Sequence, residues 1–491
     1  MGTKIRSYKL NFIMNAILTI SSMIFPLITY RYASEIILPE GTGRVSFAIS
    51  LITYFNMFAQ LGIPTYGIRA CAKVRDDKEK LTRTVHELFV INLVMALFSY
   101  IVLGIMLAFV PALNNDKVLY LIVSSIILLS AIGIEWMYKG LEQYAYITIR
   151  ALIFKFLALI AMFFVIHEKE DYVMYGAISV FASSASYIIN FIHARKYISF
   201  RLVGGYNFKR HLRYVMVFFA MSCATTIYTN LDTVMLGIMT TKTDVGYYDA
   251  AVKIKNILVG VVTSLGTVLM PRASYYIEKG MISEFKNISA RALNFVFLIS
   301  LPFVIYFIIF AKPSIFFLTG GTSFAGAVVP MQIIMPCLFL IGITNILGIQ
   351  ILIPLGREKM VLYSEVAGAV TDLALNLILI PKLAAAGAAI GTLAAETVVL
   401  VVQYIALRDE IRDAFKAIQY WKILIAVFGA SCLSILSVNF NFNEFLLLLV
   451  SAIIFFGIYF IVLLLTKEKL FWQLFCEVAN KVKKGNCNDK K

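Results

Sequence analysis

The sequence predicts an all-α polytopic membrane protein with about 14 transmembrane helices, and three observations lead to this prediction. The chain of 491 residues is 60% hydrophobic and only 15% charged, and its mean hydropathy is +0.84. A soluble globular domain is about 45–50% apolar and about 25% charged. Apolar stretches long enough to cross a bilayer also recur along the whole chain. These observations exclude a cytosolic enzyme, a disordered chain and a secreted disulfide scaffold.

The predicted spans are apolar stretches of about 20 residues, the length that crosses the hydrocarbon core of a bilayer. In chain order they are 10–30, 45–66, 86–110, 118–138, 147–166, 172–193, 213–238, 247–269, 292–311, 326–349, 360–380, 385–407, 422–438 and 445–466. Each ends where Gly, Pro or charged residues gather, in the segments 31–44, 67–85, 111–117, 139–146, 167–171, 194–212, 239–246, 270–291, 312–325, 350–359, 381–384, 408–421 and 439–444. The first span follows a basic stretch but is long and lacks a small-x-small cleavage site, so we expect an uncleaved signal anchor.

The positions of lysine and arginine predict the orientation, because cytoplasmic loops carry an excess of both residues. With a cytoplasmic N-terminus, the inner segments hold 33 of the 44 Lys and Arg residues, and the outer loops with their borders hold seven. An even number of spans also returns the Lys-rich C-terminus to the cytoplasm. Most of the formal charge of +16 therefore sets the topology. Because these residues are dispersed over short segments, we expect no nucleic-acid binding.

The six cysteines agree with this arrangement. The cytoplasmic side holds Cys71, Cys476 and Cys487, and the spans hold Cys223, Cys337 and Cys432. We expect no disulfide, because none of the six lies in an outer loop. No Cys and His pair has the spacing of metal ligands, so we expect neither a metal nor a cofactor.

A faint internal repeat indicates two halves. At an offset of 203 residues, Gly43, Ala48, Arg69 and Ala70 fall on Gly246, Ala251, Arg272 and Ala273. We predict an N-terminal six-helix lobe at 1–206, a C-terminal six-helix lobe at 207–408, a linker with helices 13 and 14 at 409–466, and a cytoplasmic basic tail at 467–491. Each lobe has an even number of spans, so both have the same topology. Transporters built this way hold the substrate between the halves and rock them around it.

Three pairs of segments resemble a known family. The first pair is residues 232–237 (DTVMLG) with 245–254 (VGYYDAAVKI), and the second is residues 135–142 (EWMYKGLE) with 146–148 (YIT). Both resemble helix motifs of bacterial polysaccharide repeat-unit flippases. The third pair, residues 376–381 (NLILIP) with 387–391 (GAAIG), resembles a segment shared with the multidrug/oligosaccharidyl-lipid/polysaccharide exporter superfamily.

The resemblance covers most of residues 1–408 and is to the Wzx-type flippases of O-antigen and capsule repeat units. It implies a V-shaped transporter whose two lobes enclose a central cavity, with two further C-terminal helices. It implies undecaprenyl-pyrophosphate-linked oligosaccharide as the substrate and the bacterial plasma membrane as the location. Membrane lipids, the polymerase and the chain-length machinery are the partners that it implies.

Nine ionisable residues inside predicted spans are candidates for a functional role, because exposure of each to lipid would cost about 2.5–3.5 kcal/mol. They are Arg150, Lys155, Lys253, Lys255, Asp232, Asp249, Glu365, Asp372 and Glu396. These side chains must face a water-filled cavity, pair with one another, or extend to the interface. Asp249 and Lys253 are four residues apart, so they share a helix face on which they can pair.

The basic residues are candidates for a substrate-binding cationic cavity, because a buried pyrophosphate needs cations beside it. This set is Arg31, Arg44, Arg150, Lys155, Lys253 and Lys255. Simpler interpretations stand beside this one. Arg31 and Arg44 lie at the outer border, where they would only extend to the interface, and Lys253 would only neutralise Asp249.

The acidic residues are candidates for ion coupling or charge pairing, because a carboxylate shielded from water binds a proton more readily. This set is Asp232, Asp249, Glu365, Asp372 and Glu396. The sequence has no G-x-x-x-x-G-K-[ST] motif, so an ion gradient is the expected energy source. The alternative is that these residues are counter-charges or polar contacts between helices.

The predicted function is therefore transport by alternating access, and we expect no enzymatic activity. An exporter of drugs or of another lipid-linked precursor on the same scaffold is an alternative, and a small cationic drug would favour an acidic cavity. A membrane-embedded polysaccharide polymerase is the alternative from another class. It is disfavoured because the outer loops are short and no nucleophile and base pair is visible.

Overall fold

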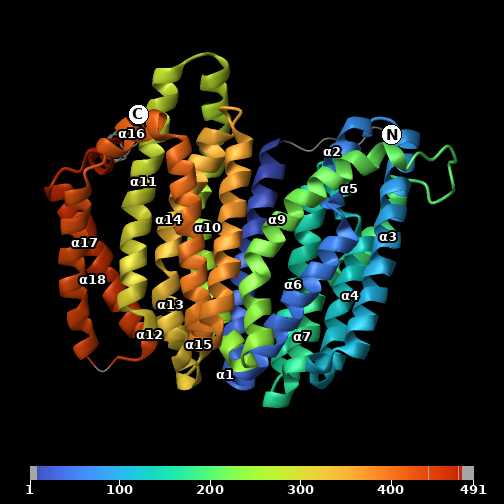
Figure 1. The fold of residues 1–491 in the computed structure, drawn as a ribbon, viewed down its shortest axis with the longest axis horizontal. Helices are drawn as coiled ribbons and strands as arrows, with labels where there is room; N and C mark the ends of the chain where they lie inside the picture. Colours follow the sequence, from blue (N-terminus) through green and yellow to red (C-terminus); the bar gives the residue numbers. More distant parts are fainter. Residues whose placement is uncertain (1–7, 441, 474, 478–491) are drawn as a thin grey trace, which may run out of the picture. The chain divides into compact units, whose positions relative to one another are not determined.

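The computed structural model describes residues 8–440, 442–473 and 475–477, and Figure 1 shows its fold. In this part of the chain every regular element is a helix or a short helical turn, with no strand. Residues 1–7, with the basic residues Lys4 and Arg6, lie outside the described residues, as do 474 and 478–491 of the predicted basic tail. The chain forms two compact units, Met1–Gly246 and Tyr247–Lys491. The predicted lobes rest on a sequence repeat rather than on packing, so their boundaries stay a prediction.

The first unit is built around its first helix. Its helices are α1 (Tyr8–Gln60), α2 (Ile63–Val74), α3 (Lys78–Phe109), α4 (Lys117–Gly133), α5 (Glu135–Gly140), α6 (Tyr144–Val165), α7 (Tyr172–Val180), α8 (Tyr187–His193) and α9 (Lys209–Met239), with the short turns η1 (Pro111–Asp116), η2 (Lys169–Asp171), η3 (Phe181–Ala185) and η4 (Ala194–Lys196). The helix α1 packs against α3, α4, α6 and α9, and these are the four most extensive helix contacts of this unit.

The second unit begins within α10 and ends with a helix pair. Its helices are α10 (Lys242–Glu278), α11 (Ile282–Ile309), α12 (Ala311–Thr319), α13 (Val328–Ile334), α14 (Pro336–Thr344), α15 (Glu358–Ala406), α16 (Arg408–Lys416), α17 (Tyr420–Ile435) and α18 (Glu444–Leu465), with the turns η5 (Thr322–Ala327), η6 (Asn345–Leu352) and η7 (Leu436–Asn439). The helix α11 packs against α14, α16 and α17, and α15 packs against α13 and α14. The last two helices, α17 and α18, lie side by side (Figure 1).

Two helices are much longer than one membrane crossing requires. α1 has 53 residues and α15 has 49. At about 1.5 Å per residue an unbroken helix of this size would measure roughly 75–80 Å, more than twice a hydrocarbon core of about 30 Å. Each has one backbone break, α1 at Leu38 (φ 61°) and α15 at Ala384 (φ 48°). A left-handed residue interrupts a helix. Each break lies between two predicted spans, so each long element covers two of them.

The membrane class is confirmed, whereas the number of spans is not. In the described part of the chain, ten helices are long and apolar enough to cross a membrane. There are eleven if the bent pair Thr322–Ile334 and Pro336–Leu352, with 40° between its parts, is one span. The helix α10, which holds the predicted span 247–269, is not among them. The fold is therefore that of an all-helical, multi-pass membrane protein, and fourteen spans remain a prediction.

Two predicted spans end earlier than expected, because residues with a positive φ turn the chain. The span predicted at 45–66 ends at Gln60, where Leu61 (φ 46°) and Gly62 (φ 72°) lead into α2. The span predicted at 118–138 ends at Gly133, and Ile134 (φ 36°) leads into α5. Hydropathy does not reveal these turns, since Leu and Ile are as apolar as the helices they end.

The short helices α2 and α5 cross at glycines. A Cβ atom on Gly67 would lie 2.6 Å from the ring of Trp136, and a Cβ atom on Gly140 would lie 2.8 Å from the carbonyl oxygen of Ile68. Only a residue without a side chain allows an approach this close. This crossing fixes α5, and with it Glu135, against α2.

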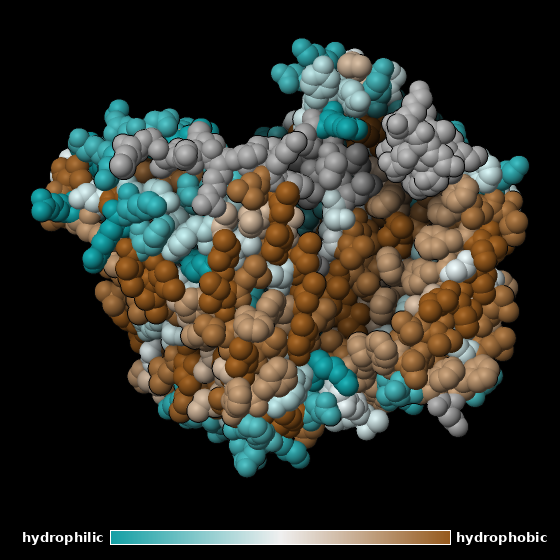
Figure 2. Space-filling model, turned by 180° about the vertical axis from the view of Figure 1, so that it is seen from behind, coloured by the Kyte–Doolittle hydropathy of each residue, from teal (hydrophilic) through white to brown (hydrophobic). Residues whose placement is uncertain are grey.

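The surface of both units is apolar where a soluble protein would be polar. Phe109 on α3, Phe164 on α6 and Phe428 on α17 have 79%, 78% and 71% of their surface exposed. In the face drawn in Figure 2, apolar side chains cover the middle, and hydrophilic side chains gather at the two ends. This distribution is expected of helices whose sides contact lipid and whose ends contact water.

Candidate functional site

Arg150 is the most buried of the predicted cations, and three side chains of the first unit surround it. It lies on α6 with 5% of its side chain exposed, and its Nη2 donates to Oε2 of Glu135 at 3.1 Å. Its guanidinium carbon lies 5.5 Å from the ring centre of Tyr187 and 6.0 Å from that of Tyr146. Its Nε and Nη1 are buried without a hydrogen-bond partner in the described part of the chain. Arg150 therefore has donors that Glu135 does not use.

Glu135 holds a second cation with its other oxygen. Its Oε1 lies 2.8 Å from Nζ of Lys139, which is one turn further along α5. One carboxylate thus faces two cations, so this cluster has a surplus of positive charge. Such a surplus favours an anion beside Arg150.

Lys155 lies on the same helix as Arg150 and contacts the first helix. Its Nζ donates to Oγ of Ser22 at 2.8 Å and to Oγ of Ser21 at 3.1 Å. The side chain is half-buried, and no carboxylate of the described residues forms an ion pair with it. This charge is solvated by hydroxyl groups rather than neutralised, so it adds to the positive potential along α6.

Arg44 differs from these cations because two carboxylates neutralise it. Its Nη1 lies 2.6 Å from Oδ1 of Asp116, and its Nη2 lies 2.7 Å from Oε1 of Glu40. The hydroxyl of Tyr172 also donates to Asp116, at 3.1 Å. The network ties α1 to η1 and α7. Arg31 lies half-buried on α1, on the other side of the break at Leu38.

The charges of α10 form one pair and leave one cation apart. Lys253 donates to Asp249 at 2.6 and 2.7 Å, the contact that the spacing of four residues predicts. Lys255 is half-buried and forms neither an ion pair nor a hydrogen bond with the described residues. Asp232 lies on α9 of the first unit with 6% of its surface exposed.

The predicted acidic residues of α15 border a close helix contact. Asp372 and Glu396 are buried, and Glu365 is half-buried. A Cβ atom on Gly391 would lie 2.3 Å from Oδ1 of Asn376 and 3.0 Å from Oδ1 of Asp372. The part of α15 after its break therefore approaches the part before it where a glycine leaves room.

Further polar pairs extend this contact into a buried seam. Nε2 of Gln403 donates to Oγ of Ser364 at 3.1 Å, across the two parts of α15. The hydroxyls of Tyr248 on α10 and Thr392 on α15 lie 2.9 Å apart. The seam is defined by six buried polar residues of α15, which are Ser364, Asp372, Asn376, Thr392, Glu396 and Gln403.

One buried acid was not among the predicted site residues. Glu87 on α3 is fully buried, although it lies inside the predicted span 86–110. Its Oε1 accepts from the backbone N–H of Asn207 at 2.6 Å, and its Oε2 lies 2.7 Å from Nε2 of His211 and 3.0 Å from Nε of Arg210. An acid in an apolar stretch was the signal that could have revealed it, as with the five acidic residues of the predicted set.

The repeat-related glycines of the sequence meet in the first unit. A Cβ atom on Gly43 would lie 1.7 Å from the carbonyl oxygen of Lys242. A Cβ atom on Gly246 would lie 2.0 Å from the carbonyl oxygen of Pro39. Pro39 and Lys242 are separated by the same offset as the two glycines. The contact is therefore reciprocal, as contacts across a two-fold axis are.

With this geometry established, the chain was compared with known families. The sequence model for the polysaccharide biosynthesis proteins matches residues 9–277, which is more than half of the chain. The chain belongs to this family. The MatE family also matches, at residues 218–378.

Two relatives of this polysaccharide biosynthesis protein are named putative O-antigen transporters. The one from Escherichia coli (strain K12) is 26% identical over 409 residues, which cover 81% of this chain and 96% of that protein. The one from Shigella dysenteriae is 24% identical over 361 residues, which cover 72% of this chain and 88% of that protein. These relatives are transporters, in agreement with the predicted class.

Two solved structures have the same fold. The lipid II flippase MurJ, in an inward closed conformation, has a TM-score of 0.71 at 17% identity, over 92% of this chain and 98% of that one. An inward-facing multidrug resistance MATE family transporter of the MOP superfamily has a TM-score of 0.63 at 13% identity, over 83% and 99%. The family member described here therefore has the fold of polytopic membrane transporters.

The buried pair of Arg150 and Glu135 leads to a stability prediction. Glu135→Gln leaves a buried guanidinium without its carboxylate, and we expect the free energy of unfolding to fall by about 3 kcal/mol. The double variant Glu135→Gln/Arg150→Gln should regain part of this loss, because neither charge then remains buried. Denaturation of the purified protein in detergent measures both.

Glu142→Gln is the matched control. It breaks the more exposed pair of Glu142 with Arg75, whose Oε1 and Nη1 lie 2.9 Å apart, and we expect a loss below about 1 kcal/mol. Equal losses for Glu135→Gln and Glu142→Gln would show that burial does not set the strength of the first pair.

Proposed function

We propose that this protein flips lipid-linked oligosaccharide repeat units across the bacterial plasma membrane during surface polysaccharide synthesis. The observation that carries the proposal is that the chain spans 96% and 88% of two relatives named O-antigen transporters, within a family of polysaccharide biosynthesis proteins. The fold shared with a lipid II flippase supports the same class of function. Both chain termini lie in the cytoplasm, as the distribution of Lys and Arg predicts.

The charges of the first unit fit an anionic headgroup. A pyrophosphate linked to undecaprenol presents phosphate oxygens, for which a planar guanidinium is a suitable donor. Arg150 has two buried nitrogens that no described residue uses, and Lys155 has only hydroxyl partners. Lys255 of the second unit, like Lys155, has no carboxylate partner among the described residues. Arg44 and Lys253 are paired, so in this proposal they have structural roles.

The reciprocal glycine contact supports alternating access. In the predicted topology, Gly43 and Gly246 lie at the outer ends of their spans, where backbone meets backbone. A contact that relates two repeats can close one side of the pathway while the other side is open. Lobes at 1–206 and 207–408, with the linker and last two helices at 409–466, fit this movement. The polymerase and the chain-length machinery would then act on the exported units.

A cell-based experiment tests the proposed function. The gene is deleted, and lipid-linked intermediates are extracted and tested for access from the outer face. We expect complete repeat units to accumulate on the cytoplasmic leaflet, because synthesis continues without translocation. Exported but unpolymerised units would identify a polymerase instead and contradict the proposal.

An exporter of drugs is the second candidate function, and the MatE match at residues 218–378 favours it. The cations of the first unit argue against a cationic drug as the substrate. Unchanged polysaccharide export in the deletion strain, together with a new sensitivity to a drug, would favour this alternative.

Ion coupling is the finer part of the proposal, and it rests on the acidic residues of α15. Glu365 is half-buried and makes neither an ion pair nor a hydrogen bond with the described residues, so its carboxylate is available to a proton or a sodium ion. Asp372 and Glu396 lie in the buried seam nearby in sequence.

We expect Glu365→Gln to remove the dependence of transport on an imposed proton or sodium gradient, because the amide cannot change its charge. Transport by purified protein in vesicles, with and without each gradient, measures this. Glu444→Gln, at the exposed start of α18, is the control and should keep the dependence. An unchanged dependence in Glu365→Gln would show that this carboxylate does not couple transport to the gradient.

A further inference from the structure

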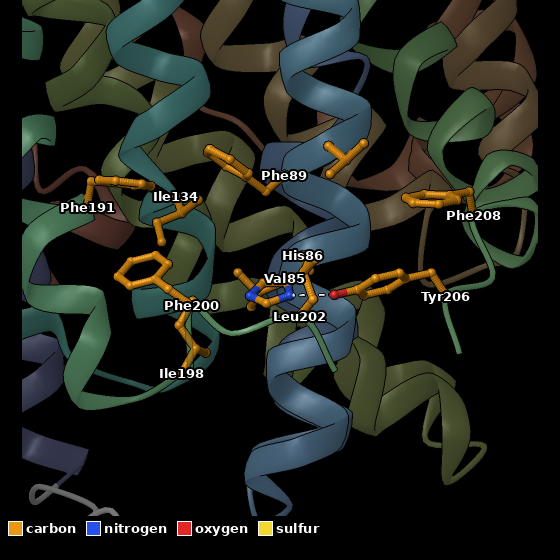
Figure 3. A pocket seen from close by; sticks show the side chains of 11 residues that line it. Val85, His86, Phe89, Ile134, Phe191, Ile198, Phe200, Leu202, Tyr206 and Phe208 are labelled. Atoms are coloured by element: carbon orange, nitrogen blue, oxygen red, sulfur yellow. Dashed lines mark hydrogen bonds between the residues drawn. The ribbon is translucent and has the colours of Figure 1, made fainter. Parts of the chain in front are cut away.

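An apolar pocket opens beside α3, and none of the predicted cations lines it. It has a volume of about 240 Å³ and lies between α3 and the segment from Phe191 to Phe208. Aromatic side chains form much of its wall, and Figure 3 shows Phe89, Phe191, Phe200 and Phe208 around it. A cavity lined this way takes an apolar chain rather than a polar ligand.

Hydrogen bonds hold the wall of the pocket in place. His86 lies 3.0 Å from the hydroxyl of Tyr206 through Nδ1, and 2.8 Å from the carbonyl oxygen of Ser199 through Nε2. The next residue, Glu87, accepts from the backbone N–H of Asn207. Two consecutive residues of α3 thus fasten a segment that has no regular structure of its own between Tyr197 and Asn207.

The segment that forms this wall is strongly basic. Residues 194–213 contain six Lys and Arg residues and no Asp or Glu. The guanidinium carbon of Arg195 lies 5.6 Å from the ring centre of Phe200, which lines the pocket. Arg201 is exposed and lies between two lining residues, Phe200 and Leu202. Leu202 has 87% of its surface exposed. The rim therefore combines positive charge with apolar side chains, the chemistry of an anionic membrane surface.

The place of the pocket along α3 agrees with such a surface. The helix begins at Lys78, in a predicted inner segment, and the pocket contacts it from Val85 to Val90. At about 1.5 Å per residue these positions lie roughly 10–18 Å into the helix. The rim is then at the level of the headgroups of the cytoplasmic leaflet, and the pocket is at the level of the acyl chains.

We propose that this pocket binds an anionic phospholipid of the cytoplasmic leaflet. One acyl chain enters between Phe89, Phe191 and Phe200, and the headgroup phosphate contacts Arg195 and Arg201. None of the cations proposed to hold the transported headgroup lines this pocket, so in this proposal the lipid is a resident ligand rather than the substrate. Because it holds the segment between α8 and α9 at the membrane, its binding stabilises the first unit.

Photolabelling of the purified full-length protein tests this site. The probe is phosphatidylglycerol with a photoreactive group on its acyl chain, and labelled peptides are located by mass spectrometry. We expect label within residues 85–90 and 191–208. Unlabelled phosphatidylglycerol should compete at least about tenfold better than phosphatidylcholine, since basic residues near a surface favour anionic lipids.

Matched variants separate the pocket from the general lipid surface. Val90→Trp fills the pocket and should lower labelling about tenfold, whereas Val94→Trp, one turn further on the same exposed side of α3, should not change it. Arg195→Gln/Arg201→Gln should abolish the preference for phosphatidylglycerol. Arg412→Gln/Lys416→Gln, which removes two exposed charges from α16, should keep it. If Val90→Trp does not fold, Leu202→Asn is used, because its side chain is already exposed.

Three results would overturn the proposal. The first is equal labelling of Val90→Trp and the parent protein, and the second is equal competition by phosphatidylcholine. The third is better competition by undecaprenyl phosphate than by phosphatidylglycerol, which would assign the pocket to the isoprenoid chain of a substrate. None of these results bears on the cellular accumulation of repeat units, so this test is independent of the proposed function.

Discussion

The structure depends on one constraint, which is that hydrocarbon offers no partner to a polar group. Every backbone amide must then be satisfied within the chain, and the described residues accordingly form helices. The same constraint explains where the helices stop. Leu38 and Ala384 break the two longest elements, and each break leaves two parts of about the length of one crossing. Charged side chains face the same requirement. Each buried charge therefore needs either a partner in the protein or a bound ion of opposite charge.

The buried charges satisfy this requirement in different ways, and the difference separates structure from function. Glu87 is fully buried but has an arginine, a histidine and a backbone amide around it, so it fastens α3 to the start of α9. Arg44 has two carboxylates and does the same for α1 and its neighbours. Arg150 has one carboxylate, which also serves Lys139, and retains unused donors. A surplus of donors at a buried guanidinium is difficult to explain by stability alone, and it fits the binding of an anion.

The helices and the contacts between residues close in sequence were predictable, whereas contacts between residues far apart in the sequence were not. Hydropathy located the membrane helices, and a spacing of four residues indicated the pair of Asp249 and Lys253. Asp116, one of the two carboxylate partners of Arg44, is in contrast 72 residues away, and His211, one partner of Glu87, is 124 residues away. No periodicity encodes such contacts. The turn at Ile134 was also hidden, because an isoleucine with a positive φ looks like helix in a hydropathy pattern. Glu135 belongs to the segment 135–142, which resembles a flippase motif. That it pairs with Arg150 follows only from the structure.

Transport by alternating access, as proposed above, requires the reciprocal contact of Pro39, Gly43, Lys242 and Gly246 to open and close. Cysteines introduced at Pro39 and Lys242, whose carbonyl oxygens lie against the opposite glycines, test this requirement. Polysaccharide export is then measured before cross-linking, after it, and after reduction. We expect cross-linking to stop export and reduction to restore it. Export that continues at the same rate with the cross-link in place would show that transport does not require this contact to open.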